Sequence, residues 1–217
     1  MRHVAAGILV FAGGFAIMVL EIIGARYLAS DFGSSFYVWV SQIGMIMTAL
    51  ALGYYVGGAL GDRWQRLRWL GVALMPAGLL TFLIPDYADG LLEAIVMRHR
   101  LDRPIPEIWL KLDPALGSAV VFFLPCLVLA TLGPCLIRLS SHQVANVGRI
   151  SGLIFAASTA GSIGGVFVSG YVLLDQFKLS TIFRMTGGLT VALGLGCWWL
   201  DPWFRLKTAP AESGHSG

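Results

Sequence analysis

The chain has 217 residues, of which 57% are hydrophobic and 12% charged, and its formal net charge is +3. Its mean hydropathy is +0.76, and its charged share is about half that of an average soluble domain. This composition argues against a water-soluble globular protein. The basic residues are spread over separate loops rather than gathered in one patch, which argues against a nucleic-acid partner.

Six segments are apolar over roughly the 20 residues that a helix needs to cross a bilayer. They lie at residues 4–25, 37–60, 69–85, 115–137, 150–173 and 179–200. The remaining loops are too short to form a second core. The sequence therefore predicts an all-α polytopic membrane protein with six transmembrane helices. They form one domain over residues 1–207, followed by a disordered tail over 208–217.

The first predicted span contains charged residues toward its outer end. Glu21 follows seventeen uncharged residues, and Arg26 comes five residues later. Arg184 lies in the sixth predicted span, close to its outer end. A charge at membrane depth is costly and usually faces the bundle interior or a cavity. We expect Glu21 to pair with Arg26 or Arg184. The carboxylate either fixes the rotation of the helices or responds to protons or cations.

Small residues recur every four positions on the second and fifth spans, which leaves one face of each helix nearly bare. These residues are Gly53, Gly57 and Gly61, and Ala157, Gly161, Gly165 and Ser169. Apolar surface gives little drive for association in lipid, so close backbone approach supplies the packing. We expect these two helices to make the tightest helix contacts of the protein.

The segment after the second span, residues 58–68, reads GALGDRWQRLR. It resembles the loop signature of the major facilitator superfamily. The matching residues are Gly58, Asp62, Arg63 and Arg66, whereas Gln65 stands where that family has a second glycine. In the family this signature is mainly conformational. The alternative is an ordinary basic loop on the inner side of the membrane.

The longest predicted loop, residues 86–114, is expected on the outer side. Apolar residues within 91–96 recur near helical spacing, which predicts a short amphipathic helix on the membrane surface. Prolines at 104, 106 and 114 are expected to prevent its continuation. The loop either connects two spans along the headgroups or covers an outward-facing cavity as a lid.

Longer segments resemble the membrane part of fused major-facilitator/spermidine-synthase-like proteins. They are residues 32–39 (FGSSFYVW), 51–63 (ALGYYVGGALGDR) and 148–161, together with Glu21 and Arg26. The likeness covers about residues 8–195. It implies a half-facilitator bundle without the aminopropyltransferase domain that many members carry. The halves of a facilitator meet mainly through their second and fifth helices. The resemblance thus implies a homodimer, or pairing with another membrane chain, through those helices.

The basic residues also predict an orientation. Eight of them lie on the side of the two termini and six on the other side. Because basic residues in short loops favour the cytoplasm, we expect both termini there and the chain in the inner (plasma) membrane.

Two functions remain open. The first is a transporter of a small polar or cationic solute. The second is a non-transporting accessory or scaffold subunit of a membrane complex, or an anchor for a separately encoded enzyme. No nucleophile–base pair occurs, and the three cysteines and four histidines show no metal-binding spacing. We therefore predict no enzyme activity, catalytic residue, metal or cofactor, and membrane lipid and a membrane chain as partners.

Overall fold

The computed structural model of the chain describes residues 2–99, 106–140 and 147–204, and its regular elements in these ranges are all helices. They are α1 (Arg2–Phe32), α2 (Phe36–Trp64), α3 (Leu67–Met97), α4 (Glu107–Ala130), α5 (Leu132–Ser140), α6 (Val147–Val168), the π-helical turn η2 (Ser169–Leu173), α7 (Leu174–Gln176) and α8 (Leu179–Phe204). The predicted tail, 208–217, lies outside the described residues.

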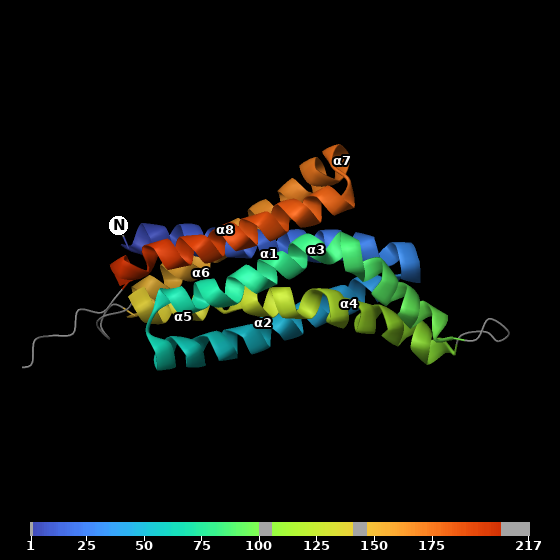
Figure 1. The fold of residues 1–217 in the computed structure, drawn as a ribbon, viewed down its shortest axis with the longest axis horizontal. Helices are drawn as coiled ribbons and strands as arrows, with labels where there is room; N and C mark the ends of the chain where they lie inside the picture. The colour runs from blue at the N-terminus through green and yellow to red at the C-terminus, as the bar shows by residue number, and fades with distance from the viewer. Residues whose placement is uncertain (1, 100–105, 141–146, 205–217) are drawn as a thin grey trace, which may run out of the picture.

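Successive long segments run in opposite directions along the bundle axis, which is horizontal in Figure 1. Helices α4 and α5 follow each other along one crossing, and α6, η2 and α7 along the next. Pro134 has no amide hydrogen to donate to the carbonyl of residue 130, which explains the break at Thr131 between α4 and α5. We call the end of the bundle that holds Arg2, Trp64 and Phe204 the terminus end, and the opposite end the far end.

Five helical stretches in the described part of the chain are long and apolar enough to cross a membrane. They are His3–Phe32, Phe36–Trp64, Leu67–Met97, Glu107–Ser140 and Val147–Gln176. This confirms an all-α bundle typical of a multi-pass membrane protein. Helix α8 has 26 residues but is not among the five, because Arg184 and its glycines and threonines lower its hydropathy. A sixth crossing remains a prediction.

The structure replaces most of the predicted outer loop 86–114 with helix. Helix α3 continues to Met97, and α4 already begins at Glu107. The predicted surface helix is the end of α3, where Leu92 is fully buried. Pro106 caps the start of α4, a position where a missing amide hydrogen costs little. Pro106 therefore begins a helix, Pro114 lies inside it, and only residues 100–105 of this region are not described.

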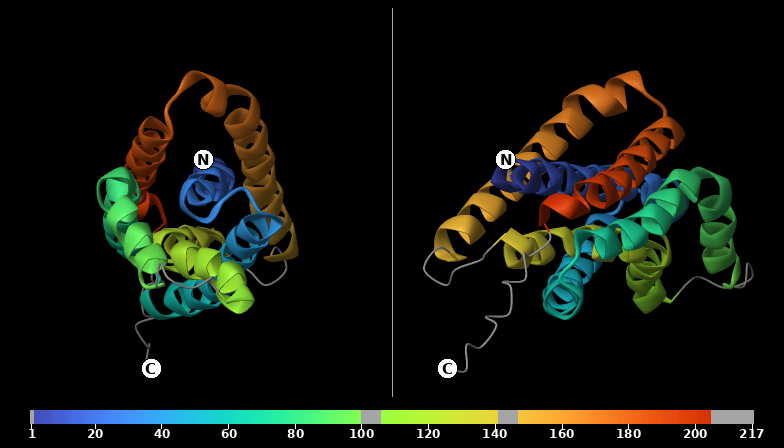
Figure 2. Two further views of the ribbon diagram at one scale, coloured as in Figure 1. Left: turned by 90° about the vertical axis from the view of Figure 1, so that its right-hand side faces the viewer. Right: turned by 60° about the vertical axis from the view of Figure 1, so that its left-hand side comes forward.

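Three sets of helices account for the most extensive packing: α3 with α8, α1 with α6, and α2 with α4 and α5. Helix α1 lies inside the bundle, between α6 and α8 (Figure 2). The pairing is symmetric when the long segments are divided into two sets of three, with α1, α2 and α3 in one set and α4–α5, α6–α7 and α8 in the other. Helix α1 packs on α6 as α4 packs on α2. Helix α3 packs on α4 as α8 packs on α1.

Helices α3 and α8 touch through glycines on both sides. A Cβ atom added to Gly78 would lie 2.7 Å from the amide nitrogen of Val191, and one added to Gly71 would lie 2.5 Å from the carbonyl oxygen of Gly194. A Cβ on Gly187 would collide with the backbone of Phe82. Backbone thus packs on backbone along this pair, which the sequence analysis did not anticipate.

The small-residue faces of α2 and α6 pack inside the same chain. A Cβ on Gly57 would lie 2.7 Å from the Cα atom of Thr131, and one on Gly165 would lie 2.6 Å from the carbonyl oxygen of Phe15. Gly53 and Gly161 make equally close contacts with α4 and α1. Because these faces are covered, a second chain can reach α2 and α6 only from their other sides. The glycine-lined faces of α2 and α6 therefore serve packing within the chain.

The remaining members of these faces follow the same arrangement. Gly61 lies against Cys135 and Arg138 of α5, and Ala157 lies opposite Gly7 of α1. Ser169 is fully buried in η2, and its hydroxyl has no hydrogen-bond partner within the described residues.

A valine at Gly187 should separate α3 from α8, whereas a valine at the neighbouring Gly188 should be tolerated. Nothing lies within 4 Å of a Cβ at Gly188. We expect Gly187→Val to lower the free energy of unfolding by about 1–3 kcal/mol. Thermal unfolding of the detergent-solubilised protein measures the difference. Equal midpoints for the two variants would contradict the packing described here.

Candidate functional site

One face of α1 is turned toward the space between α2 and α6. Gly14 lies on this face, and its carbonyl oxygen accepts a hydrogen bond from the hydroxyl of Ser162 in α6 (3.4 Å). Ile17 lines a cavity of about 30 Å³ with Tyr54 of α2. Glu21 is the next residue on this face, because positions three and four apart are neighbours on a helix. We call Gly14, Ile17 and Glu21 the α1 stripe.

A buried polar cluster fixes the helices beside the α1 stripe. Gln42 of α2 is fully buried. Its side-chain amide donates to the carbonyl oxygen of Leu20 in α1 (3.4 Å), and its Oε1 accepts from the hydroxyl of Ser118 in α4 (2.6 Å). Gly24 leaves the space for this amide, since a Cβ there would collide with Gln42. The cluster joins three helices, and both polar side chains in it are hydrogen-bonded.

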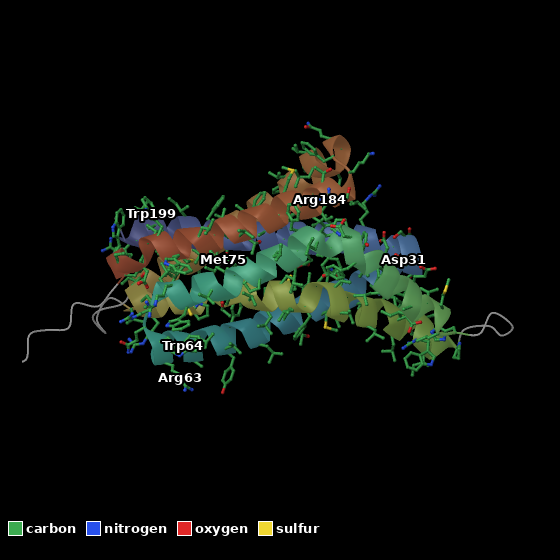
Figure 3. All side chains as sticks on the ribbon, viewed as in Figure 1. Asp31, Arg63, Trp64, Met75, Arg184 and Trp199 are labelled. Atoms are coloured by element: carbon green, nitrogen blue, oxygen red, sulfur yellow. The ribbon has the colours of Figure 1, made fainter. Side chains whose placement is uncertain are left out.

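Glu21 lies on the α1 stripe without the predicted partner. Its side chain is partly buried and forms no hydrogen bond or ion pair within the described residues. Arg26 is five residues away, which places it about 140° further around the helix. Arg184 instead pairs with Asp86 of α3, with 3.2 Å between its Nη2 and Oδ1 of Asp86. Figure 3 shows Arg184 on α8 at the end opposite Trp199.

Arg26 lines a second cavity, which lies at the far end of the bundle. This cavity of about 490 Å³ is lined by α1, the start of α2 and the α7–α8 turn. Besides Arg26, it exposes Ser30, Ser34 and Trp39. Its volume falls in the range of small-molecule sites. The π-helical turn η2 and α7 project from the bundle near this end (Figure 1), and π-helical turns occur frequently at functional sites.

The loop signature forms a turn between α2 and α3 at the terminus end. Oδ1 of Asp62 accepts from Nε of Arg138 in α5 at 2.5 Å. Gln65 has φ 45°, a left-handed conformation that favours glycine, and it occupies the position where the facilitator signature has glycine. Gly58 has open space around it. Arg63 and Arg66 have no hydrogen bond or ion pair in the described part of the chain.

A charge cluster that was not predicted from the sequence joins the end of α3 to the start of α4. Asp113 of α4 is nearly buried and pairs with the guanidinium of Arg98. The other carboxylate oxygen, Oδ2, lies 2.7 Å from Nε2 of His99. The Arg98 guanidinium also lies 4.2 Å from the centre of the Trp109 ring. The signal was an acid directly before a proline, but an expected loop gave no reason to pair it with Arg98.

These features define the class of protein to which the chain is assigned. The chain is an all-α bundle whose long apolar helices are typical of a multi-pass membrane protein. Comparison with protein families, curated proteins and solved structures finds no match to this chain. Across the described ranges, no three His, Cys, Asp or Glu side chains gather as metal ligands would. The α1 stripe and the Arg26 cavity therefore form the candidate site.

Two carboxylates on different helices should respond in opposite ways to neutralisation. Asp113→Asn removes the charge that Arg98 and His99 face, so we expect the free energy of unfolding to fall by about 1.5–3 kcal/mol. Glu21→Gln removes a charge without a described partner, so we expect an unchanged or higher unfolding midpoint. Thermal unfolding in detergent compares the two. A large loss for Glu21→Gln would reveal a structural partner for this carboxylate.

Proposed function

We propose that the chain is one unit of a membrane transporter, and that two copies together enclose a path for a small polar or cationic solute along the α1 stripe. The observation that carries this proposal is the uneven burial of the helices. In the most apolar stretch of α2, 22% of the residues are buried, and in that of the α6–α7 segment 17% are buried. The corresponding shares of the other three spans are 44–56%.

The charge of Glu21 on the α1 stripe supports a dimer in which a second copy covers the stripe. In a single copy Gly14 and Ile17 of the stripe are buried, whereas Glu21, beyond them on α1, is only partly buried. Glu21 would then lie at membrane depth beside lipid, which is costly for a carboxylate. A second copy seated on the outward sides of α2 and α6 would exclude lipid and leave Glu21 facing an internal path.

The helix pairing supports a half-facilitator arrangement. Transporters of this class are built from repeats, and their sites lie at the interface between the repeats. The symmetric pairing of the two sets of three segments fits such a repeat. The pair of Asp62 and Arg138 at the terminus end fits the conformational role that the loop signature has in facilitators. We propose that the two units are parallel copies related by a two-fold axis, because such an interface is closed and self-complementary.

The same arrangement supports the proposed orientation in the membrane. The terminus end carries Arg63, Arg66, Arg68 and Arg138. Basic residues in short loops stay on the cytoplasmic side. We therefore propose that the terminus end faces the cytoplasm and that the chain lies in the inner (plasma) membrane.

Glu21 and the Arg26 cavity bear on the class of solute. A carboxylate on the path suits a polar solute that carries a cationic group. The far-end cavity, about 490 Å³ in volume, is large enough to hold a small polar solute together with water. This favours a small polar or cationic solute over an apolar one.

One observation favours a second candidate, an accessory or scaffold subunit or an anchor for a separately encoded enzyme. The cavity beside Ile17 is about 30 Å³, which is room for only two or three water molecules. A bundle this tightly packed beside the stripe leaves no path for a solute and suits a subunit that holds other chains together. In that case the exposed sides of α2 and α6 would hold a different membrane chain.

Cysteine cross-linking in native membranes tests the pairing. Tyr55 of α2 and Ile163 of α6 are among the most exposed apolar residues of these helices, at 79% and 53%. We expect the double variant Tyr55→Cys/Ile163→Cys to form covalent dimers with a short bismaleimide reagent. The matched control, Leu79→Cys/Leu195→Cys on α3 and α8, should stay monomeric. The pairing would be refuted by dimers in the control alone, or by none in either variant.

Uptake by proteoliposomes separates the two candidate functions. We expect the reconstituted chain to accumulate small cationic or polar solutes, and Glu21→Gln to lower the uptake of a cation at least tenfold. The conservative variant Glu21→Asp should retain part of the activity. A reconstituted dimer that moves none of a panel of such solutes would support the scaffold instead.

A further inference from the structure

An apolar slot lies at the terminus end of the bundle, between α2, α3 and α5. Its walls are formed mainly by Leu60, Leu70, Ala73 and Leu139. The cavity volume is about 40 Å³, room for about three water molecules and therefore for a few methylene groups. The slot is too small for an apolar ligand of its own, but it can hold one end of an acyl chain whose remainder lies in the bilayer.

Three arginines in or next to the residues that line the slot form its rim: Arg63, Arg66 and Arg68. Arg66 lines the slot itself, and neither Arg66 nor Arg63 has an ion-pair partner within the described residues. The Arg68 guanidinium lies 5.5 Å from the centre of the Trp69 ring. The rim is therefore basic and holds two guanidinium groups that no described acid neutralises.

The acidic groups close to this rim are engaged elsewhere. Asp62 pairs with Arg138 of α5. Asp201 of α8 is nearly buried and accepts a hydrogen bond from the backbone amide of Arg68 (3.0 Å). Neither carboxylate is paired with Arg63 or Arg66, so the guanidinium groups of these residues can attract an anion at the rim.

Two tryptophans place the slot at the depth of the membrane surface. The rings of Trp64 and Trp69 lie 5.2 Å apart and both border the slot. Each is about two-fifths exposed, and tryptophan is enriched where headgroups meet acyl chains. Figure 3 shows Arg63 and Trp64 together at the end of α2, with Arg63 pointing away from the bundle.

From this geometry we infer that the slot is a binding site for one anionic phospholipid. The lipid phosphate lies at Arg66 and Arg63, and the first methylene groups of one acyl chain enter the slot between Leu60 and Ala73. An inorganic phosphate would leave the apolar walls unused. A lipid without net charge would leave the two guanidinium groups without a counter-ion. Basic pockets between transmembrane helices bind anionic headgroups in this way.

Native mass spectrometry of the full chain, released from nanodiscs of phosphatidylcholine with 30% phosphatidylglycerol, tests the site. We expect one phosphatidylglycerol to remain bound through a mild delipidation step that removes phosphatidylcholine. Arg66→Gln should lower the retained fraction about fivefold, the contribution of one arginine near an anionic surface. Arg149→Gln is the matched control, because Arg149 is an exposed arginine at the start of α6, at the same end of the bundle.

A second variant tests the acyl-chain part of the site without changing charge. Ala73→Leu fills the slot and should also release phosphatidylglycerol, while its unfolding midpoint stays within a few degrees of that of the unmodified protein. Added inorganic phosphate at 10 mM should not displace the lipid. Equal retention by Arg66→Gln and Arg149→Gln would overturn the proposal, as would equal retention of the two lipids or displacement by free phosphate.

Discussion

Close contact between helix backbones is the constraint on which the rest of this structure depends. In lipid, an apolar side chain gains little free energy by moving from contact with acyl chains to contact with another helix. Helices therefore associate through dense packing and polar contacts. Here three pairs of helical segments meet where a glycine lets a neighbouring backbone come near: Gly78 and Gly187 between α3 and α8, Gly161 between α1 and α6, and Gly57 between α2 and the α4–α5 junction. These contacts set the rotation of each helix and thereby determine which face remains free.

The sequence predicts the apolar helices, five of which are long and apolar enough to cross a membrane, but it predicts their ends and neighbours less well. A run of apolar residues reveals the part of a helix inside the bilayer, and α3 and α4 extend beyond it because a helix needs no lipid to continue into water. Likewise, Gly53 and Gly161 indicate faces of close approach without indicating what approaches. The backbone opposite Gly53 is at Leu127, in a stretch without glycine, whereas the backbone opposite Gly161 is at Phe11, between Gly7 and Gly14. Between α3 and α8 the signal was present, since Gly71 and Gly78 share their spacing of seven with Gly187 and Gly194.

The candidate site shows the same division. Glu21 and Arg26 could be singled out because each interrupts an apolar run. Their separation by five residues already places them on different faces of one helix. The partner of Arg184 was hidden, because Asp86 lay in a segment predicted as a loop. The cluster of Gln42, Ser118 and Leu20 depends on three helices whose relative rotation follows from packing alone.

Polar groups of this bundle fall into two sets with different consequences. Gln42 and Asp113 are satisfied within the chain and hold helices together. Glu21, Arg26 and Arg66 have no described partner, and they lie on the α1 stripe, in the far-end cavity and beside the slot at the terminus end. The second set indicates where something other than this chain belongs: a solute, a second copy and a lipid, respectively, in the proposals made above.

The mass of the protein as it leaves its own membrane tests the central claim most directly. Extraction in a styrene–maleic acid copolymer retains the surrounding lipid, and light scattering with separate measurement of protein and lipid gives the protein mass alone. The account predicts twice the chain mass of 23.4 kDa, with no other polypeptide in the particle. A particle that holds a single copy would contradict it, because the outward sides of α2 and α6 would then face lipid beside an uncovered Glu21.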